Sequence, residues 1–178
     1  MKKFLLFAFF IIILTLSAAA QTSVKVGSTA PVFSGIAMDG TSYDLNDLRG
    51  SVVVVTFWST KCEICHRELP KLNRFTERYD SNKVFFLALT MENEDKIAGY
   101  LKSNPFKFQI LPNSFGVVLQ YADRDKAGNI DMGFPSFFVI DQEGLVQYRS
   151  SGYDKTAPLD AAITKLITKE TTLKMSGN

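Results

Sequence analysis

The sequence predicts an α/β fold in which a central mixed β-sheet is flanked by helices. Residues 52–57 and 83–89 are short, nearly unbroken apolar runs, which are typical of strands buried on both faces. A helical pattern separates them, so a right-handed crossover should make the two strands parallel. Residues 136–140 and 145–149 are predicted to form an antiparallel strand pair around an Asp-Gln-Glu-Gly turn, which makes the sheet mixed.

The domain should begin with a β-hairpin extension. Residues 24–30 are expected to form an extended lead-in segment. The Asp-Gly pair at 39–40 predicts a turn between two short strands, 33–37 and 42–45. A short helical turn over residues 46–50, capped by an Asn or Asp side chain and ended by glycine, should lead into the first buried strand.

Helices and shorter strands are expected in the rest of the chain. Pro70 lies inside the first expected helix, where the missing backbone donor should kink it. The polar stretch 122–131 is expected to be a loop. The other expected elements are a helix from the cysteines to about Tyr79, a helix over 93–103, a short strand over 106–111, a short helix over 114–121 and an amphipathic helix over 156–169.

Length and composition predict one globular domain, residues 21–170, followed by a frayed tail, residues 171–178. Residues 1–20 are predicted to be a secretory signal peptide. Two lysines precede an apolar run too short for a comfortable membrane span, and small residues favour cleavage before Gln21. Cleavage removes both lysines, so the formal charge falls from +2 to about 0. A chain without a net positive charge does not have the basic surface that is typical of nucleic-acid-binding proteins. We therefore expect an exported protein, periplasmic or extracytoplasmic, that binds no nucleic acid.

The only two cysteines, Cys62 and Cys65, lie between the first buried strand and the first helix. Unpaired N–H groups and the positive end of the helix dipole stabilise a thiolate there. We expect Cys62, at the exposed tip, to attack a disulfide and Cys65 to resolve the mixed disulfide. A purely structural disulfide closing so short a loop would stabilise the fold by only roughly 2 kcal/mol, so the redox interpretation is favoured. The pair itself is then the redox group, and no cofactor or metal is expected.

The same residues allow a second interpretation. The run from Cys62 to His66 matches the C-x-x-C-H signature of covalent c-type haem attachment, and His66 is the only histidine. A haem needs an apolar pocket and usually a second axial ligand, whereas this motif follows a buried strand of a sheet protein. The haem interpretation is therefore the less favoured alternative.

Glu92 is the candidate proton-handling residue. Parallel strands leave a sheet at the same edge, so the segment after residue 89 should approach the cysteines. A carboxylate there can accept and return the proton of Cys65. The alternative role for Glu92 is an exposed acid that stabilises a helix start.

Several motifs together resemble a known family. Residues 57–65, Phe-Trp-Ser-Thr-Lys-Cys-Glu-Ile-Cys, resemble the F-W-[AS]-x-W-C-x-x-C site of thioredoxin-like proteins. Residues 65–70 resemble the C-x-x-E-x-P pattern of the exported TlpA/ResA group. Residues 133–144 are similar to that group's G-x-P-T-x-F-x-I-D-x-x-G pattern, and residues 26–40 match its N-terminal pattern. The chain thus resembles an exported thioredoxin-like thiol–disulfide oxidoreductase of this group.

The resemblance implies a thioredoxin fold and an enzyme that exchanges thiols and disulfides outside the cytoplasm. It implies that Pro135 is cis and faces the cysteine pair, so that the backbone of Phe134 can pair with a substrate strand. Trp58 belongs to the same expected substrate-binding surface, and Glu92 is the expected active-site acid. The expected partners are protein disulfides, including those of apocytochromes c, and a membrane electron donor that re-reduces the pair. No oligomeric state is indicated.

The chain departs from the family pattern at three places. Lys61 replaces the usual Trp, which makes the surface beside Cys62 more polar and more positive. Thr56 stands where ordinary thioredoxins have a buried Asp, which strengthens the case for Glu92. The polar stretch 122–131 is longer than the family's connection, either as a partner-selecting loop or as a neutral insertion.

A thiol peroxidase of the peroxiredoxin type is the other alternative, because related folds share the N-terminal pattern. Ser59 fits the hydroxyl position of the P-x-x-x-[ST]-x-x-C motif. However, Val55 occupies the proline position, and Cys62 already has a partner thiol. The dithiol interpretation is therefore favoured over the peroxidase.

The direction of electron transfer is predicted from Glu63, which lies between the cysteines. Its negative charge should disfavour the thiolate by repulsion. A strongly oxidising pair needs a very stable thiolate, so a weak to moderate reductant is favoured.

Overall fold

The computed structural model describes residues 23–176, with side chains described as far as residue 168. In this part of the chain a five-stranded sheet has the strand order β5-β4-β3-β8-β9, and two small hairpins pair β1 with β2 and β6 with β7. The elements, in chain order, are β1 (Ser34–Ile36), β2 (Ser42–Asp44), β3 (Val52–Phe57), α2 (Glu63–Arg78), β4 (Val84–Leu89), α3 (Glu94–Leu101), β5 (Gln109–Leu111), α4 (Phe115–Tyr121), β6 (Asp123–Arg124), β7 (Ile130–Asp131), β8 (Ser136–Ile140), β9 (Val146–Ser151) and α5 (Thr156–Ser176).

The sheet is built around β3, whose residues are all buried. β3 pairs in parallel with β4, with Val52 opposite Val84 and Phe57 opposite Leu89, and it pairs antiparallel with β8 on its other side. Its valines suit this central place because β-branched side chains pack well on both faces of a sheet. The parallel pairing directs the chain after β3 and the chain after β4 to the same edge of the sheet.

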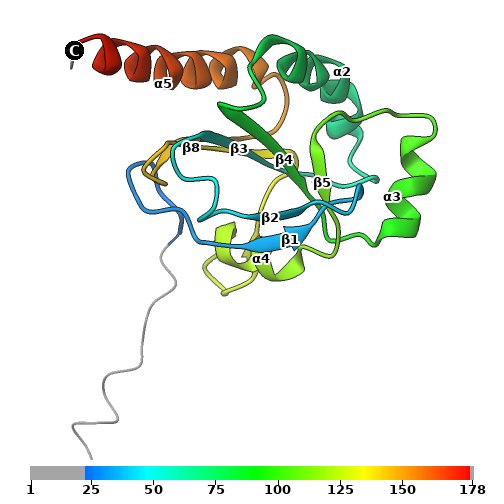
Figure 1. Ribbon diagram of the computed structural model, residues 1–178. Coiled ribbons are helices and arrows are strands. Elements are labelled where there is room, and N and C mark those ends of the chain that lie inside the picture. Colours follow the sequence, from blue (N-terminus) through cyan, green and yellow to red (C-terminus); the bar gives the residue numbers. More distant parts are fainter. Residues whose placement is uncertain (1–22, 177–178) are drawn as a thin grey trace, which may run out of the picture.

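Helices cover both faces of the sheet. In Figure 1, α2 and α5 lie above the sheet, and α4 lies below it with the β1–β2 hairpin. Successive β3 residues alternate between two cores. Val54 belongs to the core that α2 and α5 complete, and Val55 belongs to the core that α4 and the hairpin complete. Packing on both sides therefore fixes β3 and the residues that follow it.

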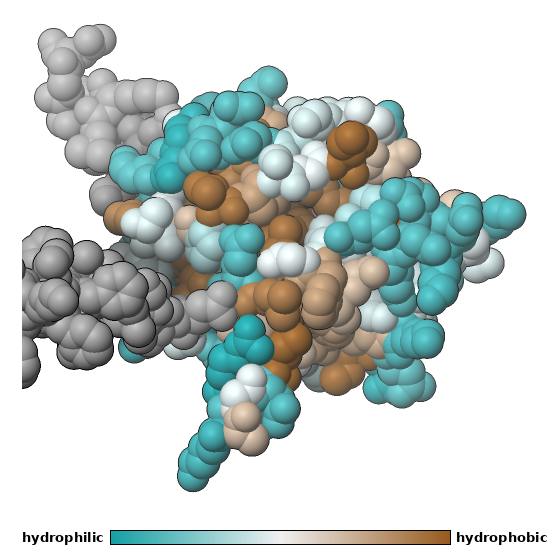
Figure 2. Space-filling view, turned by 90° about the horizontal axis from the view of Figure 1, so that it is seen from below, coloured by the Kyte–Doolittle hydropathy of each residue, from teal (hydrophilic) through white to brown (hydrophobic). Residues whose placement is uncertain are grey.

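The lower face of the molecule is formed by short segments. Figure 2 shows it from below, with hydrophobic patches between hydrophilic side chains. The hydroxyl of Tyr121, at the end of α4, donates a hydrogen bond of 2.8 Å to the carbonyl oxygen of Pro31. This contact ties α4 to the segment that leads into the β1–β2 hairpin.

The predicted architecture is confirmed: a mixed sheet is flanked by helices and preceded by a β-hairpin. Several details differ or are refined. Residues 46–50 form turns rather than a helical turn, and the capping side chain is Asp44, whose carboxylate accepts a hydrogen bond from the backbone N–H of Asn46. The last helix continues to Ser176, so residues 171–176 are helical where a frayed tail was expected. α2 continues through Pro70 as a single helix.

The polar stretch 122–131 is a second hairpin, β6–β7, rather than the expected loop. The Asp125 carboxylate accepts hydrogen bonds from the backbone N–H groups of Ala127 and Asn129, at 2.8 and 2.9 Å. Gly128 adopts a φ of 85°, which glycine tolerates without strain. Two-residue strands carry no detectable alternation of hydrophobicity, which is why the sequence pattern did not indicate them.

The lead-in segment lies against the start of β9, but it is not extended throughout as expected: residues 26–27 form a turn in which Gly27 adopts a φ of 88°. Thr29 forms a β-bridge with Leu145, and the backbone N–H of Gly27 donates to the carbonyl oxygen of Val146 at 2.7 Å. The expected signal peptide, residues 1–20, and its cleavage site before Gln21 lie outside the described residues. Among the helices that the structure describes, none combines the length and the hydropathy needed to cross a membrane.

Candidate active site

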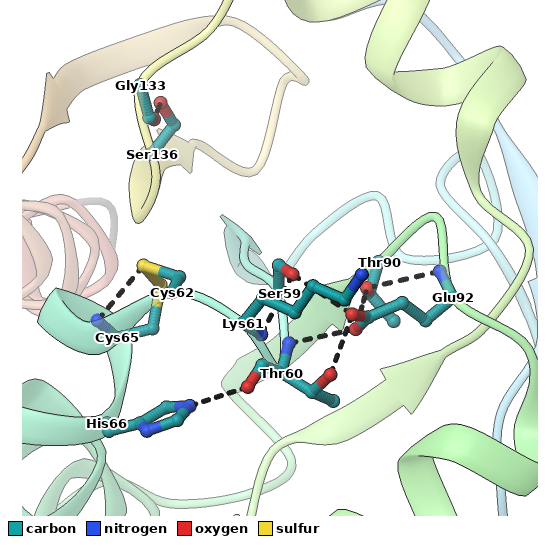
Figure 3. Close-up of a disulfide and its surroundings, with 10 residues drawn as sticks. All are labelled: Ser59, Thr60, Lys61, Cys62, Cys65, His66, Thr90, Glu92, Gly133 and Ser136. Atoms are coloured by element: carbon teal, nitrogen blue, oxygen red, sulfur yellow. Dashed lines mark hydrogen bonds between the residues drawn. A yellow bond between two sulfur atoms is a disulfide. The ribbon is translucent and has the colours of Figure 1, made fainter.

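The cysteine pair lies at the sheet edge where β3 ends and α2 begins (Figure 3). Cys62 and Cys65 form a disulfide, with 5.2 Å between their Cα atoms. Cys62 is the N-cap of α2, and its Sγ accepts a hydrogen bond of 3.1 Å from the backbone N–H of Cys65. Cys62 is partly exposed, whereas Cys65 is 2% exposed. The first sulfur is therefore the one that an incoming molecule reaches, and the helix N-terminus stabilises negative charge on it.

Glu92 holds the loop that leads to Cys62 (Figure 3). Its Oε1 accepts hydrogen bonds from the hydroxyls of Ser59 and Thr60, at 3.0 and 2.7 Å. Its Oε2 accepts from the backbone N–H of Thr60 at 2.9 Å and from the Thr90 hydroxyl at 3.0 Å. The segment after β4 thus reaches the cysteine edge as expected, but its carboxylate binds the loop ahead of the cysteines.

These contacts argue against the expected proton-handling role of Glu92. Burial raises the pKa of its carboxyl group, but the hydrogen bonds from Thr60, Ser59 and Thr90 outweigh burial and leave the pKa below its ordinary value of 4.5. Each carboxylate oxygen already accepts two hydrogen bonds, so no lone pair is left for the proton of Cys65. In the structure Glu92 thus acts as an anion that fixes the loop, and its expected role in proton transfer stays a prediction.

His66 holds the same loop from another direction. Its Nε2 lies 2.8 Å from the carbonyl oxygen of Thr60, so this nitrogen carries the proton that is donated. Its ring lies against that of Tyr100, with centroids 4.9 Å apart. A histidine that is engaged through Nε2 in this way does not offer that nitrogen as an axial ligand. The arrangement therefore does not favour the haem interpretation.

Trp58 is a core residue rather than part of a substrate-binding surface. Its side chain is 1% exposed, and the rings of Tyr100 and Phe106 pack against it with centroids 5.5 and 5.3 Å away. Its backbone N–H donates to the carbonyl oxygen of Leu89 at 3.1 Å. The expectation that Trp58 contacts substrate is therefore corrected: the residue anchors the start of the cysteine loop.

The Phe134–Pro135 peptide bond is cis, as the resemblance implied. Ser136 pairs with Phe57, so Pro135 lies level with the first residue after β3. Figure 3 shows the loop that ends at Ser136 across from the disulfide. Phe134 is partly exposed, and the carbonyl oxygen of Pro135 accepts a hydrogen bond of 2.9 Å from the backbone N–H of Gly152. This cis-proline loop therefore lies opposite the cysteine pair at the same edge of the sheet.

Glu68 is a functional candidate that the sequence analysis missed. It lies one turn after Cys65 on the buried face of α2, and it is 0% exposed. Its Oε1 pairs with the Lys71 Nζ at 3.1 Å, whereas its Oε2 has no hydrogen-bond partner among the described residues. The spacing Cys-x-x-Glu in a helix was the available signal, because residues three apart share a face.

Known proteins with similar sequences provide a family for this site. Residues 25–165 match the family described as Redoxin. The chain belongs to the Redoxin family. Its Redoxin relatives include the thiol-disulfide oxidoreductase ResA of Geobacillus thermodenitrificans, which is 33% identical over 71% of this chain and 70% of its own. The ResA of Bacillus cereus (strain ATCC 10987 / NRS 248) is 26% identical over 93% of this chain and 99% of its own.

The Redoxin chain also has a solved structural neighbour. A thiol:disulfide interchange protein of the thioredoxin family from Chlorobium tepidum aligns with a TM-score of 0.66 at 23% identity, and the alignment covers 82% of this chain and 99% of the neighbour. At that identity the likeness shows the fold alone. The predicted thioredoxin fold and the resemblance to the TlpA/ResA group of thioredoxin-like proteins are thereby confirmed.

The lowered pKa of Glu92 predicts how the Redoxin protein responds to acid. The pKa is lower in the folded protein than in the unfolded chain, so the carboxylate contributes stability above the unfolded pKa and loses it as the pH falls through the folded pKa. Glu92→Gln should be less stable by about 1–2 kcal/mol at neutral pH, because donors around the loop lose their acceptor. It should then lose less stability than wild type as the pH falls below about 4.5.

Urea unfolding of both proteins at a series of pH values measures this difference. Asp47→Asn, a substitution at an exposed acid, is the matched control and should follow the wild-type profile. Identical acid profiles for wild type and Glu92→Gln would show that the carboxylate does not hold the loop as an anion.

Proposed function

We propose that this protein is a thiol–disulfide oxidoreductase that reduces protein disulfides outside the cytoplasm. The observation that carries the proposal is the unequal environment of the two sulfurs: Cys62 is accessible at a helix N-terminus, and Cys65 is buried beneath it. The names of the ResA relatives support the same activity. The cysteine pair is the redox group, and the reaction as proposed needs no bound cofactor.

The first step is attack by the Cys62 thiolate on a substrate disulfide. A bond forms between the Cys62 Sγ and one substrate sulfur, the substrate S–S bond breaks, and the other substrate sulfur leaves as a thiolate that takes up a proton. The hydrogen bond from the Cys65 N–H and the N-terminal end of α2 stabilise the attacking charge. The product of this step is a mixed disulfide on Cys62.

The second step is resolution by Cys65. Its thiol loses a proton and attacks the Cys62 Sγ, and the second substrate sulfur leaves as a thiolate that takes up a proton. The Cys62–Cys65 disulfide that results is the state seen in the structure. Two electrons have then passed to the substrate. Since water does not reach the buried thiol, a base beside it is required, and Oε2 of Glu68 is the unpartnered acceptor on the same helix face.

The substrate is proposed to be an extended protein segment that contains a disulfide. The backbone of Phe134, next to the cis Pro135, is the expected pairing partner for such a segment. The disulfides of apocytochromes c are one class of such substrates. Because the pair ends each cycle oxidised, a membrane electron donor is proposed to re-reduce it. The proposed location is extracytoplasmic, as the N-terminal sequence predicts.

The two cysteines should differ in what they trap. Cys65→Ser should accumulate a mixed disulfide between Cys62 and the natural partner, because no thiol remains to resolve it. Cys62→Ser should trap nothing, since the remaining thiol is buried. Mass spectrometry of complexes isolated from each variant checks this. Adducts that form on Cys65 instead would reverse the assignment of nucleophile and resolver.

The buried acid gives a kinetic prediction. Glu68→Gln keeps the shape of the side chain but cannot take the proton of Cys65, so reduction of a model disulfide should slow by about 10²-fold. Alkylation of reduced Cys62 should continue at nearly the wild-type rate. A thermal melt of the variant separates the loss of chemistry from damage to the fold. A folded Glu68→Gln protein with wild-type kinetics would remove Glu68 from the mechanism.

The direction of electron transfer is tested by the reduction potential. Glu63 lies in the first turn of α2, exposed and next to Cys62, where its charge opposes that of the thiolate. We therefore expect a potential between about −200 and −300 mV, measured by equilibration with glutathione or dithiothreitol. A value near about −120 mV, as in strong periplasmic oxidants, would contradict the reductant role.

A further inference from the structure

Lys71 links the buried acid of the site to the protein surface. It follows Glu68 by three residues on α2, and its Nζ lies 3.1 Å from Oε1 of Glu68. The Lys71 side chain is 39% exposed, whereas that of Glu68 is fully buried. Among the ion pairs of the described residues, this pair alone includes a fully buried carboxylate. A carboxylate in that position is ionised only if a partner compensates for its lost hydration.

The two carboxylate oxygens of Glu68 have different surroundings. Oε1 is occupied by the ammonium group, and Oε2 is buried without a partner. Cys65 lies on the same face one turn earlier and is itself buried. A carboxylate held by one oxygen keeps the lone pairs of the other oxygen available, which is what a proton acceptor for a neighbouring thiol needs.

Lys71 is itself held by the loop between β9 and α5. Its Nζ lies 3.4 Å from Oδ1 of Asp154 and 5.1 Å from the centroid of the Tyr153 ring. The backbone N–H of Gly152, in the same loop, donates to the carbonyl oxygen of Pro135. The loop between β9 and α5 therefore contacts both Lys71, which pairs with the buried Glu68, and the cis-proline loop at Pro135.

We propose that Lys71 is a positioning residue for thiol–disulfide exchange: it holds Oε1 of Glu68 so that Oε2 can take the proton of Cys65. The inference rests on the proposed function, because it concerns the base of the resolving step. The loop that carries Tyr153 and Asp154 supports the lysine. Loss of Lys71 should therefore slow resolution of the mixed disulfide and leave its formation unchanged.

The charged and titratable groups that the contacts place around Glu68 are few. Cys65 and Lys71 belong to its own helix, and Asp154 and Tyr153 reach it through Lys71 from the loop after β9. Asp160 of α5, which also packs on α2, pairs with Arg78 and Tyr79 further along the helix instead. Removing the Lys71 charge therefore removes the direct cationic partner of Glu68.

The test compares the two steps in Lys71→Met. Reduced protein is mixed with a peptide that contains one disulfide, the reaction is quenched with acid, and mass spectrometry measures the mixed disulfide and the product over time and pH. The variant should accumulate the mixed disulfide because its decay slows by about 10-fold or more. The pH profile of that decay should also change, because the group that takes the proton of Cys65 has lost its cationic partner. Alkylation of Cys62 should not change.

Matched variants separate positioning from a general effect on the fold. Lys71→Arg keeps the cation and should restore most of the decay rate. Asp154→Asn should slow decay by a smaller factor, because it loosens the support of the lysine and leaves the lysine in place. Lys107→Met removes an exposed lysine that pairs with Glu77. It lies just before β5, away from the cysteine edge, and should behave as wild type.

The outcomes distinguish this inference from the proposed function. Wild-type decay and pH profile in Lys71→Met, together with slow decay in Glu68→Gln, would overturn the positioning role and leave the base in place. Wild-type decay in both variants would overturn both assignments. If Lys71→Met melts below the assay temperature, Asp154→Asn is compared with Lys71→Arg instead. Decay of the mixed disulfide at the wild-type rate in both of these variants would overturn the inference.

Discussion

The parallel pairing of β3 with β4 is the constraint on which the site depends. It brings two chain segments, far apart in sequence, to one edge of the sheet, and the antiparallel β8 begins at that same edge. The cysteine loop, Glu92 and the cis-proline loop converge there because each follows or precedes one of three adjacent strands. α2 then covers the face above β3, so it carries one sulfur at the edge and the other in the core.

Two glutamates near the disulfide have opposite surroundings, and these surroundings support the different roles that we propose for them. Glu92 accepts four hydrogen bonds and has a pKa below its ordinary value, which suits it to hold the loop as an anion at neutral pH. Glu68 is fully buried and has one oxygen without a partner. Saturation with donors suits a carboxylate to hold a loop, whereas an oxygen without a partner, on the helix face that also buries Cys65, suits it to exchange a proton.

The parts of the molecule that a sequence pattern can reveal were predicted well, and the parts decided by tertiary contacts were not. The strand Ser136–Ile140 was predicted to the residue, because its apolar run is bounded by clear turn residues. The cysteine pair was found from its spacing. The burial of Trp58 depends on Tyr100 and Phe106, which are more than forty residues away, and no local pattern encodes that packing. The choice between Glu68 and Glu92 likewise depended on which hydroxyls lie nearby.

Trp58 is an intrinsic fluorescence probe of the molecule. It is the only tryptophan in the chain, so all indole fluorescence comes from one position. That position is buried, at the start of the loop that ends in the disulfide, and its ring touches Tyr100, which in turn touches the ring of His66 next to Cys65. Trp58 and Cys65 belong to the same buried cluster, so changes of bonding between the two sulfurs occur close to the single emitter. We therefore expect the emission spectrum of the unlabelled protein to change with the redox state of the pair.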